Sequence, residues 1–446
     1  MHRTTLAAPA AVLATVLATV LATSLACAAP LSPTEQNIVA QVQARSGPAL
    51  GLLERAVNIN SGTMNHAGVK AVGSLFRAEL DALGFRTRWI DMPPEMQRAG
   101  HLVAERTGKR GKRVLLIGHL DTVFEKDSPV QLWQRNGDRV RGQGVNDMKG
   151  GDVIIIEALR ALHAAGALDD TSITVFFSGD EENAGEPKAV SRGDMVAAAK
   201  RSDVALAFET TVLDKEGNAT GTIGRRASSS WDLEVRGKQG HTSGIFSKNA
   251  GYGAIYETAR ILDAFRQQVV EPDLTYSPGL ILGGTETGYD AGTERGTAFG
   301  KTNVIANTAS VKGDLRYLDY GQRDRARAKM QGIVEQNLPG TSASIVFHDS
   351  YPPMAPTAGN LKLLGLYSQA SADAGLGAIA ALPPGQRGAG DVQFVAPYVD
   401  SLDGLGASGK GAHSPDEDLD VKSIERATVR TALYLYRLTQ QAAQSN

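Results

Sequence analysis

The sequence has a single cysteine among 446 residues, Cys27, and this residue lies close to the N-terminus. If the chain is cut after Ala28, the mature protein contains no thiol. Disulfide bonds and thiolate-bound metals are then excluded. Any metal in the mature protein must be held by histidine, aspartate or glutamate side chains.

Segment 1–28 has the pattern of a cleavable export signal. A basic start at Arg3 precedes an apolar run over residues 6–25, and small residues surround Cys27. A transmembrane anchor is the competing interpretation, but no charged stop-transfer segment follows the run. Lipid attachment at Cys27 is a less favoured alternative, because Ser24 stands where such sites usually carry leucine. We therefore expect a periplasmic or secreted protein.

The sequence also lacks a strong charge of either sign. Lys+Arg number 46 and Asp+Glu 48, which gives a formal net charge of −2. The basic residues are dispersed, which argues against nucleic acid as a partner. Apart from the signal segment, nothing indicates a stable membrane partner. With 42% hydrophobic residues, the chain can bury a large core and is long enough for two domains.

Strand and helix patterns alternate through the first half of the chain, which predicts an α/β fold with a mostly parallel central sheet. The apolar run at 114–117 is typical of a strand buried on both faces. From 225 to 349 the pattern changes to half-buried strands with two helices. We expect this segment to be an inserted α+β domain, and 29–224 with 350–446 to form the main domain. Two glycine-rich stretches are expected to be long loops: 283–300 and 375–411.

Histidine and acidic residues follow several of the predicted strands. In open α/β sheets, ligands bind at the carboxyl ends of the strands. Carboxylates crowded at such an edge repel one another unless cations neutralise them, which suggests two zinc ions or other divalent metals. The candidate residues are His119 with Asp121, Asp147, Glu181 with Glu182, Glu209 and His413.

These residues lie in motifs that resemble the co-catalytic zinc metallopeptidases, a family that includes glutamate carboxypeptidase, aminoacylase, acetylornithine deacetylase and succinyl-diaminopimelate desuccinylase. The resemblance covers almost the whole mature chain. It implies a catalytic domain with an inserted lid or dimerisation domain. The matching motifs are Gly-His-Leu-Asp-Thr-Val at 118–123, Gly-Val-Asn-Asp-Met-Lys-Gly-Gly at 144–151, Asp-Glu-Glu at 180–182, Phe-Glu at 208–209, Gly-His at 240–241, and His413.

The resemblance also implies a role for each of these residues. Asp121 would orient a histidine ligand from behind. Glu181 would be the general base, which takes a proton from the attacking water and returns it to the leaving nitrogen. A cis peptide bond is expected between Asp147 and Met148. The implied ligand set is Asp147 shared by both ions, His119 and Glu209 on one ion, and Glu182 and His413 on the other.

Four more residues match substrate-contacting positions of the family. His241 would stabilise the oxyanion in a neighbouring active site, although an isolated Gly-His turn is more often a surface histidine. Asn303 and Arg316 match lid positions that bind a substrate carboxylate. Arg316 could equally form an ion pair with Asp314 or Asp319. Gly390 lies in a segment similar to the family's substrate loop, but that segment lacks the usual threonine.

The resemblance implies an exported dizinc hydrolase of small peptides or N-acyl amino acids. Glu209 favours a carboxypeptidase that releases a C-terminal residue such as glutamate. The alternatives are an N-acyl-amino-acid deacylase or a dipeptidase of the same family. A non-catalytic periplasmic binding protein is a remote alternative, because Glu181 and all five ligands are present. A homodimer formed through the lid is also expected.

Overall fold

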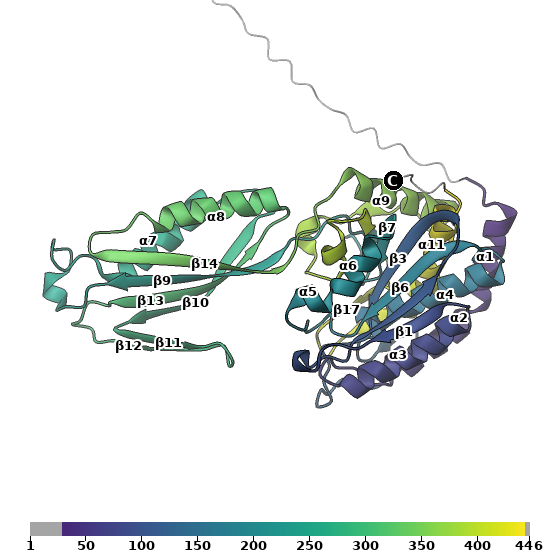
Figure 1. Cartoon of the computed structure of the whole chain (residues 1–446), viewed down its shortest axis with the longest axis horizontal. Helices are drawn as coiled ribbons and strands as arrows, with labels where there is room; N and C mark the ends of the chain where they lie inside the picture. Colours follow the sequence, from purple (N-terminus) through teal and green to yellow (C-terminus); the bar gives the residue numbers. More distant parts are fainter. Residues whose placement is uncertain (1–28, 442–446) are drawn as a thin grey trace, which may run out of the picture.

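The computed structural model describes residues 29–441 and has two lobes (Figure 1). The larger lobe is built from the two ends of the described chain, and the smaller lobe from the middle segment. Backbone hydrogen bonds between Arg225 and Met354 join the segments that enter and leave the smaller lobe. The expected export signal lies outside the described residues. Within 29–441 no helix is both long and apolar enough to cross a membrane.

A six-stranded sheet forms the centre of the larger lobe. Its last four strands are parallel, whereas β1 and β2 are antiparallel to their neighbours. This arrangement confirms the predicted α/β class with a mostly parallel sheet. In spatial order the strands are β1 (Arg86–Ile90), β2 (His101–Arg106), β6 (Thr171–Ser178), β3 (Arg110–His119), β7 (Val204–Ala207) and β16 (Ser401–Leu402).

Alternating side chains of the central strands bury both faces of the sheet. Leu116 and Val175 face a large core formed with six helices, whereas Leu115 and Phe176 face a smaller core on the other side. The six helices are α1 (Pro33–Ala44), α2 (Ser46–Val57), α3 (His66–Asp81), α4 (Gly150–Ala164), α9 (Ala358–Asp373) and α11 (Val421–Leu438). The opposite face packs against α6 (Gly193–Ala199) and α10 (Val392–Val395), and the short α5 (Lys188–Ser191) precedes α6.

Local sequence signals account for the first helix. Ser32 and Glu35 form a capping box: the Glu35 N–H donates to the Ser32 hydroxyl at 3.3 Å, and the Ser32 N–H donates to the Glu35 carboxylate at 2.8 Å. The helix ends at Arg45, where the backbone leaves the helical region, and α2 begins at the next residue.

The smaller lobe, which we call the lid, has one antiparallel sheet and two helices over one of its faces (Figure 1). Its core is separate from those of the larger lobe and contains Trp231, Phe265 and Met330. The strand order is β10 (Thr275–Gly284), β13 (Thr308–Arg316), β9 (Ser228–Gly237) and β14 (Thr341–Tyr351), and the helices are α7 (Gly253–Gln268) and α8 (Tyr320–Val334).

One of the two expected glycine-rich loops is ordered as a β-hairpin. Strands β11 (Glu286–Asp290) and β12 (Arg295–Phe299) pair with each other along most of the predicted loop 283–300. The prediction was wrong because four of the six glycines in 283–300 lie within paired strands, while the Asp290 side chain closes the turn. Asp290 accepts hydrogen bonds from Gly292 N–H at 2.9 Å and from the Thr293 hydroxyl at 2.7 Å.

Short elements complete the larger lobe. The β8–β15 pair and a small four-stranded sheet, in the order β17-β18-β5-β4, lie outside the central sheet. Their bounds are β4 (Gln134–Asn136), β5 (Arg139–Arg141), β8 (Thr220–Gly221), β15 (Ala380–Ala381), β17 (Gly409–Lys410) and β18 (Asp418–Asp420). The short helical turns of the larger lobe are η1 (Pro94–Met96), η2 (Val145–Lys149) and η4 (Pro384–Gln386), and η3 (Thr242–Gly244) belongs to the lid.

Candidate metal centre

Six histidine and acidic side chains meet at the carboxyl edge of the central sheet. The parallel register aligns His119, at the end of β3, with Ser178 of β6, so the loops that follow these strands begin at the same edge. The contributing segments are β3 with His119, the loop after β6 with Glu181 and Glu182, the chain after β7 with Glu209, η2 with Asp147, and the loop between β17 and β18 with His413.

Asp147 is shared by two groups of three side chains. Its Oδ1 lies 3.3 Å from His119 Nε2, and Glu209 Oε1 lies 3.7 Å from the same nitrogen. Its Oδ2 lies 3.2 Å from His413 Nε2, which is 3.0 Å from Glu182 Oε2. Within each group, one ligand atom from every residue lies within 4.8 Å of the others. Three protein ligands with a remaining open position are typical of a catalytic metal site.

The electrostatics of this cluster favour bound cations. Burial raises the pKa of Glu181 well above its ordinary value, and burial with the nearby Asp147 raises the pKa of Glu209 to about 7. Glu182 Oε1 is buried without a hydrogen-bond partner among the described residues. Divalent ions would neutralise these carboxylates and give that oxygen a partner. The residues present therefore fit a pair of divalent metal ions.

Asp147 differs from the other carboxyl groups in the cluster. Burial opposes its ionisation, but hydrogen bonds with His119 and His413 hold its pKa below the ordinary value of 3.8. The peptide bond from Asp147 to Met148 is cis, as expected from the resemblance. Asp147 is thus the anionic centre between the two histidines.

Asp121 lies behind the cluster and is completely buried. His119 Nδ1 lies 3.0 Å from the Asp121 backbone carbonyl but 3.6 Å from its carboxylate. The carboxylate accepts hydrogen bonds from the backbone N–H groups of Glu181 at 3.0 Å and Glu182 at 3.1 Å, and from the Thr63 hydroxyl at 2.6 Å. Both the main-chain carbonyl and the carboxylate of Asp121 therefore lie on the Nδ1 side of the His119 ring, and the carboxylate also holds the loop that carries Glu181 and Glu182.

A buried ion cluster holds the acidic loop, residues 180–182, in place. The Arg192 guanidinium, which is 1% exposed, contacts Asp180, and its Nε donates to Asp391 Oδ1 at 2.6 Å. Asp180 directly precedes the two glutamates, and Asp391 ends the expected substrate loop. One arginine therefore fixes both loops relative to each other. Sequence reasoning missed Arg192, because nothing in its local sequence indicates a partner so distant in the chain.

His101 fixes the start of the same acidic loop as a neutral ring. Gly179 N–H donates to His101 Nδ1 at 3.2 Å, so the ring proton is on Nε2, which donates to the Ser191 carbonyl at 2.9 Å. The charged groups around it are Asp180, Arg192 and Asp391. Burial is the largest effect and lowers the pKa of His101 below its ordinary value of 6.5.

The cluster opens into a pocket of about 360 Å³. One wall carries Glu181 and every candidate metal ligand except His119, and another carries Arg225, Arg387, Gly388 and Ala389. Neither arginine was predicted. The only sequence signal was that Arg387 adjoins the glycine-rich segment assigned to the substrate.

His241 and Asn303 lie at the remote end of the lid. Tyr351 pairs with Ser228 at the near end of the sheet, and its hydroxyl donates to the Glu181 carbonyl at 3.2 Å. From Ser228 to Gly237, β9 extends about 30 Å at about 3.3 Å per residue. His241 follows this strand and is exposed. It lies beside Asn303, whose carbonyl accepts a hydrogen bond from Thr242 N–H. Neither residue lines the pocket of its own chain.

The other two predicted substrate residues also lie outside the pocket lining. Arg316 ends β13 and donates through Nε to both Asp314 oxygens, at 2.9 and 3.0 Å, which matches the ion-pair alternative. Gly390 lies behind the pocket wall, where an added Cβ would come within 2.7 Å of Arg225 Nη1. Its role in this structure is close packing of the main chain against that guanidinium.

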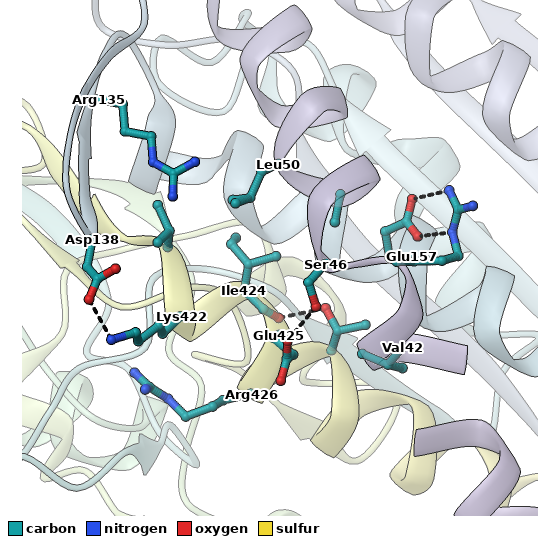
Figure 2. A pocket seen from close by; sticks show the side chains of 14 residues that line it. Val42, Ser46, Leu50, Arg135, Asp138, Glu157, Lys422, Ile424, Glu425 and Arg426 are labelled. Carbon is teal, nitrogen blue, oxygen red and sulfur yellow. Dashed lines mark hydrogen bonds and ion pairs between the residues drawn. The ribbon is translucent and has the colours of Figure 1, made fainter. Parts of the chain in front are cut away.

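A second hollow of about 500 Å³ lies between α1, α2 and α11, and residues of the β4–β5 hairpin also line it (Figure 2). Its charged groups are largely paired with one another. Lys422 Nζ lies 2.5 Å from Asp138 Oδ2, and Arg45 Nε lies 2.8 Å from Glu157 Oε2. Because these charges are already compensated, the hollow is a poor match for a charged ligand.

The family model described as peptidase family M20/M25/M40 matches residues 115–437. The chain belongs to this family. The matched segment includes every candidate metal ligand and Glu181, and so both ligand groups at the sheet edge. The chain is therefore a hydrolase of the metallopeptidase type, as the sequence predicted.

Curated relatives and a solved structure agree with this membership. The chain is 27% identical over 409 residues to carboxypeptidase G2 from Pseudomonas sp. (strain RS-16), covering 89% of this chain and 91% of the relative. It is 27% identical over 408 residues to succinyl-diaminopimelate desuccinylase from Gluconacetobacter diazotrophicus, covering 88% and 97%. The fold matches aminopeptidase PepT from Bacillus cereus with a TM-score of 0.70 at 14% identity, covering 88% of this chain and 98% of that one.

The neutral state of His101 predicts a specific loss of stability in acid. Because the folded-state pKa lies below that of the unfolded ring, the unfolded chain binds the proton first as the pH falls. The contribution of His101 is present above pH 6.5 and is lost below it, with a limiting slope of about 1.4 kcal/mol per pH unit.

This loss can be measured by urea unfolding at pH 7.5 and pH 5.5 for the wild type and His101→Gln, both stripped of metal. The wild type is expected to lose more stability between the two pH values than the variant, which lacks the titrating ring. Equal losses would show that His101 does not titrate on unfolding.

Proposed function

We propose that the protein is an exported dizinc hydrolase that cleaves an amide bond and releases a C-terminal amino acid such as glutamate. The observation that carries this proposal is the pair of ligand groups that share Asp147, with Glu181 beside them. The similarity to carboxypeptidase G2 supports the choice of a carboxypeptidase. The carboxylate and imidazole ligands suit zinc, although other divalent ions remain alternatives.

Glu181 moves the proton in this reaction. Its carboxylate lies in the same cluster as His119 and Glu182, within reach of a water at the open positions. It accepts a proton from the attacking water and passes it to the leaving nitrogen. When bound, the two ions supply the positive charge that polarises the scissile carbonyl and lowers the pKa of water.

Two alternatives use the same site. The likeness to a succinyl-diaminopimelate desuccinylase favours an N-acyl-amino-acid deacylase, and the fold shared with an aminopeptidase is compatible with a dipeptidase. Both differ from the leading proposal only in what lies on either side of the scissile bond. A non-catalytic binding protein would not need Glu181. The effect of substituting Glu181 on activity therefore distinguishes a binding protein from all three enzymes.

Glu181→Gln is expected to retain two zinc ions per chain and to lose on the order of 10²–10⁴-fold in kcat, because only the proton acceptor is removed. Asp147→Asn is the companion variant and is expected to lose zinc from both sites. Zinc content is measured by elemental analysis, and amino-acid release by mass spectrometry from a mixed set of N-acyl amino acids and short peptides. Full activity of Glu181→Gln would contradict the proposed mechanism.

We also propose that the chain is exported and cut near Ala28. The support is the sequence pattern of segment 1–28. The intact mass of the protein recovered from the periplasm tests this. A mass that corresponds to the loss of the first 28 residues is expected, whereas an uncut or lipid-modified chain would contradict cleavage.

The remote position of His241 supports a dimer in which each lid serves the partner's site. One chain cannot bring His241 near its own Glu181 without a large movement of the lid, since β9 separates them by about 30 Å. We propose a homodimer through the lid, in which His241 stabilises the oxyanion at the neighbouring active site. This site then depends on both chains.

Mixing two weakened variants tests this arrangement. Glu181→Gln and His241→Ala are each expected to lose at least about 10²-fold in kcat. After subunit exchange, a mixed dimer has one complete site, so activity should return to about a quarter of the wild-type value. No recovery, with exchange verified by native mass spectrometry, would place His241 outside the neighbouring site.

A further inference from the structure

The pocket has a cationic wall that the metal centre does not use. Arg225 and Arg387 lie on it, together with the main chain of Gly388 and Ala389. Both arginine side chains are largely buried, Arg225 at 2% exposure and Arg387 at 10%. Asp403 is the acidic residue that the two guanidiniums share. The other carboxylates that act on Arg387, Glu209 and Asp147, belong to the metal centre. Bound divalent ions would neutralise them, and the wall would then have one carboxylate for two guanidiniums.

Arg225 is fully committed to holding the wall together. Its Nε donates to Asp403 Oδ2 at 2.6 Å, and its Nη1 donates to the carbonyls of Gly388 at 3.0 Å and Ala389 at 2.7 Å. Its remaining nitrogen, Nη2, has no further hydrogen bond within the described part of the chain but contacts the Asp403 carboxylate, so the guanidinium has little capacity left for a ligand. Arg225 is therefore a structural residue of the pocket.

Arg387 is held in place but only partly satisfied. Its Nη1 donates to the Thr210 carbonyl at 3.0 Å, whereas its Nη2 is 3.9 Å from Asp403 Oδ2. Its Nε is buried and has no hydrogen-bond partner among the described residues. Burial and the neighbouring Arg225 both lower the pKa of Arg387, which reflects the cost of the uncompensated charge. An anionic ligand would remove this cost.

The position of Arg387 indicates which anion it can bind. Thr210, to which it is anchored, directly follows Glu209 of the metal centre. In an amide substrate, the α-carboxylate of the released residue is joined to the scissile nitrogen through a single carbon. A substrate whose scissile carbonyl lies at the metal centre therefore has this carboxylate beside the ligand cluster.

We propose that Arg387 is the specificity residue that binds the α-carboxylate of the amino acid released by the proposed hydrolase. This inference rests on the proposed function. The guanidinium uses its free N–H groups for the carboxylate, while the Thr210 carbonyl fixes its orientation. The lid residue Arg316 is the rival candidate, but it is paired with Asp314 and does not line this pocket.

Three substrates separate the two carboxylates of a glutamate conjugate. N-benzoyl-glutamate has both carboxylates, its α-amide lacks only the α-carboxylate, and its γ-amide lacks only the side-chain carboxylate. For Arg387→Gln, kcat/KM for N-benzoyl-glutamate and for the γ-amide is expected to fall about 10–100-fold, mainly through KM. For the α-amide, the wild type and the variant are expected to agree within about threefold, because the carboxylate that Arg387 would bind is absent.

Two further variants control for the planar shape of the guanidinium and for a nearby positive charge. Arg387→Lys keeps the charge without the planar fork and is expected to give an intermediate loss. Lys410→Gln removes an exposed cation from the rim of the same pocket. It should change KM for all three substrates by similar small factors that shrink as salt is added. Metal content and melting temperature of each variant are measured alongside the kinetics.

The outcomes distinguish the inference from the function on which it rests. If the wild type cleaves none of the three substrates nor any other N-acyl amino acid or short peptide, the proposed function fails and the inference falls with it. If the wild type cleaves N-benzoyl-glutamate but Arg387→Gln retains its preference for the acid over the α-amide, only the inference is overturned. If Arg316→Gln instead loses the preference for N-benzoyl-glutamate over the α-amide, the lid residue binds the α-carboxylate.

Discussion

Mutual repulsion among buried carboxylates is the constraint on which the rest of the structure depends. Asp147, Glu181, Glu182 and Glu209 approach one another at one edge of the sheet, where burial disfavours their ionised forms. Such a cluster is stable as an anionic site only when positive charge is present. Divalent ions bound by the neutral histidines and the carboxylates would supply this charge. The surrounding structure must hold the carboxylates in place against this repulsion.

The support comes from buried groups that connect distant parts of the chain. Asp121 binds the main chain of the acidic loop, His101 fixes its start, and Arg192 ties it to Asp391. Each of these contacts is fully enclosed, and removing one partner would leave a buried charge or donor unsatisfied. The acidic loop is thus positioned by the fold itself, independently of metal and substrate.

The proposed functional residues are distributed over both lobes. The larger lobe carries the candidate metal ligands, Glu181 and the arginine wall, so the proposed catalytic residue and the proposed anion site belong to the same lobe. The lid has its own core, and its long sheet carries His241 far from the pocket of the same chain. A residue at that distance acts on a substrate only if the lid moves or if a second chain provides it.

The sequence alone determined the α/β class and the candidate metal ligands. Buried strands are recognisable from their apolar runs, and polar residues just beyond them must lie at one edge when the strands are parallel. The strand pattern therefore groups His119, Glu181 and Glu209 at that edge. The hairpin over β11 and β12 was not predicted, because glycine content indicated a loop while strand pairing depends on the partner strand.

Only the tertiary structure decided how the site is supported and which arginine faces the substrate. Arg192 and Asp391 are about two hundred positions apart in the sequence, and neither lies in a local pattern that indicates an ion pair. Arg387 is anchored by the Thr210 carbonyl and shares Asp403 with Arg225, and these residues meet only in the folded chain. Strand and ligand patterns are local in sequence, whereas the balance of buried charges depends on which distant segments pack together.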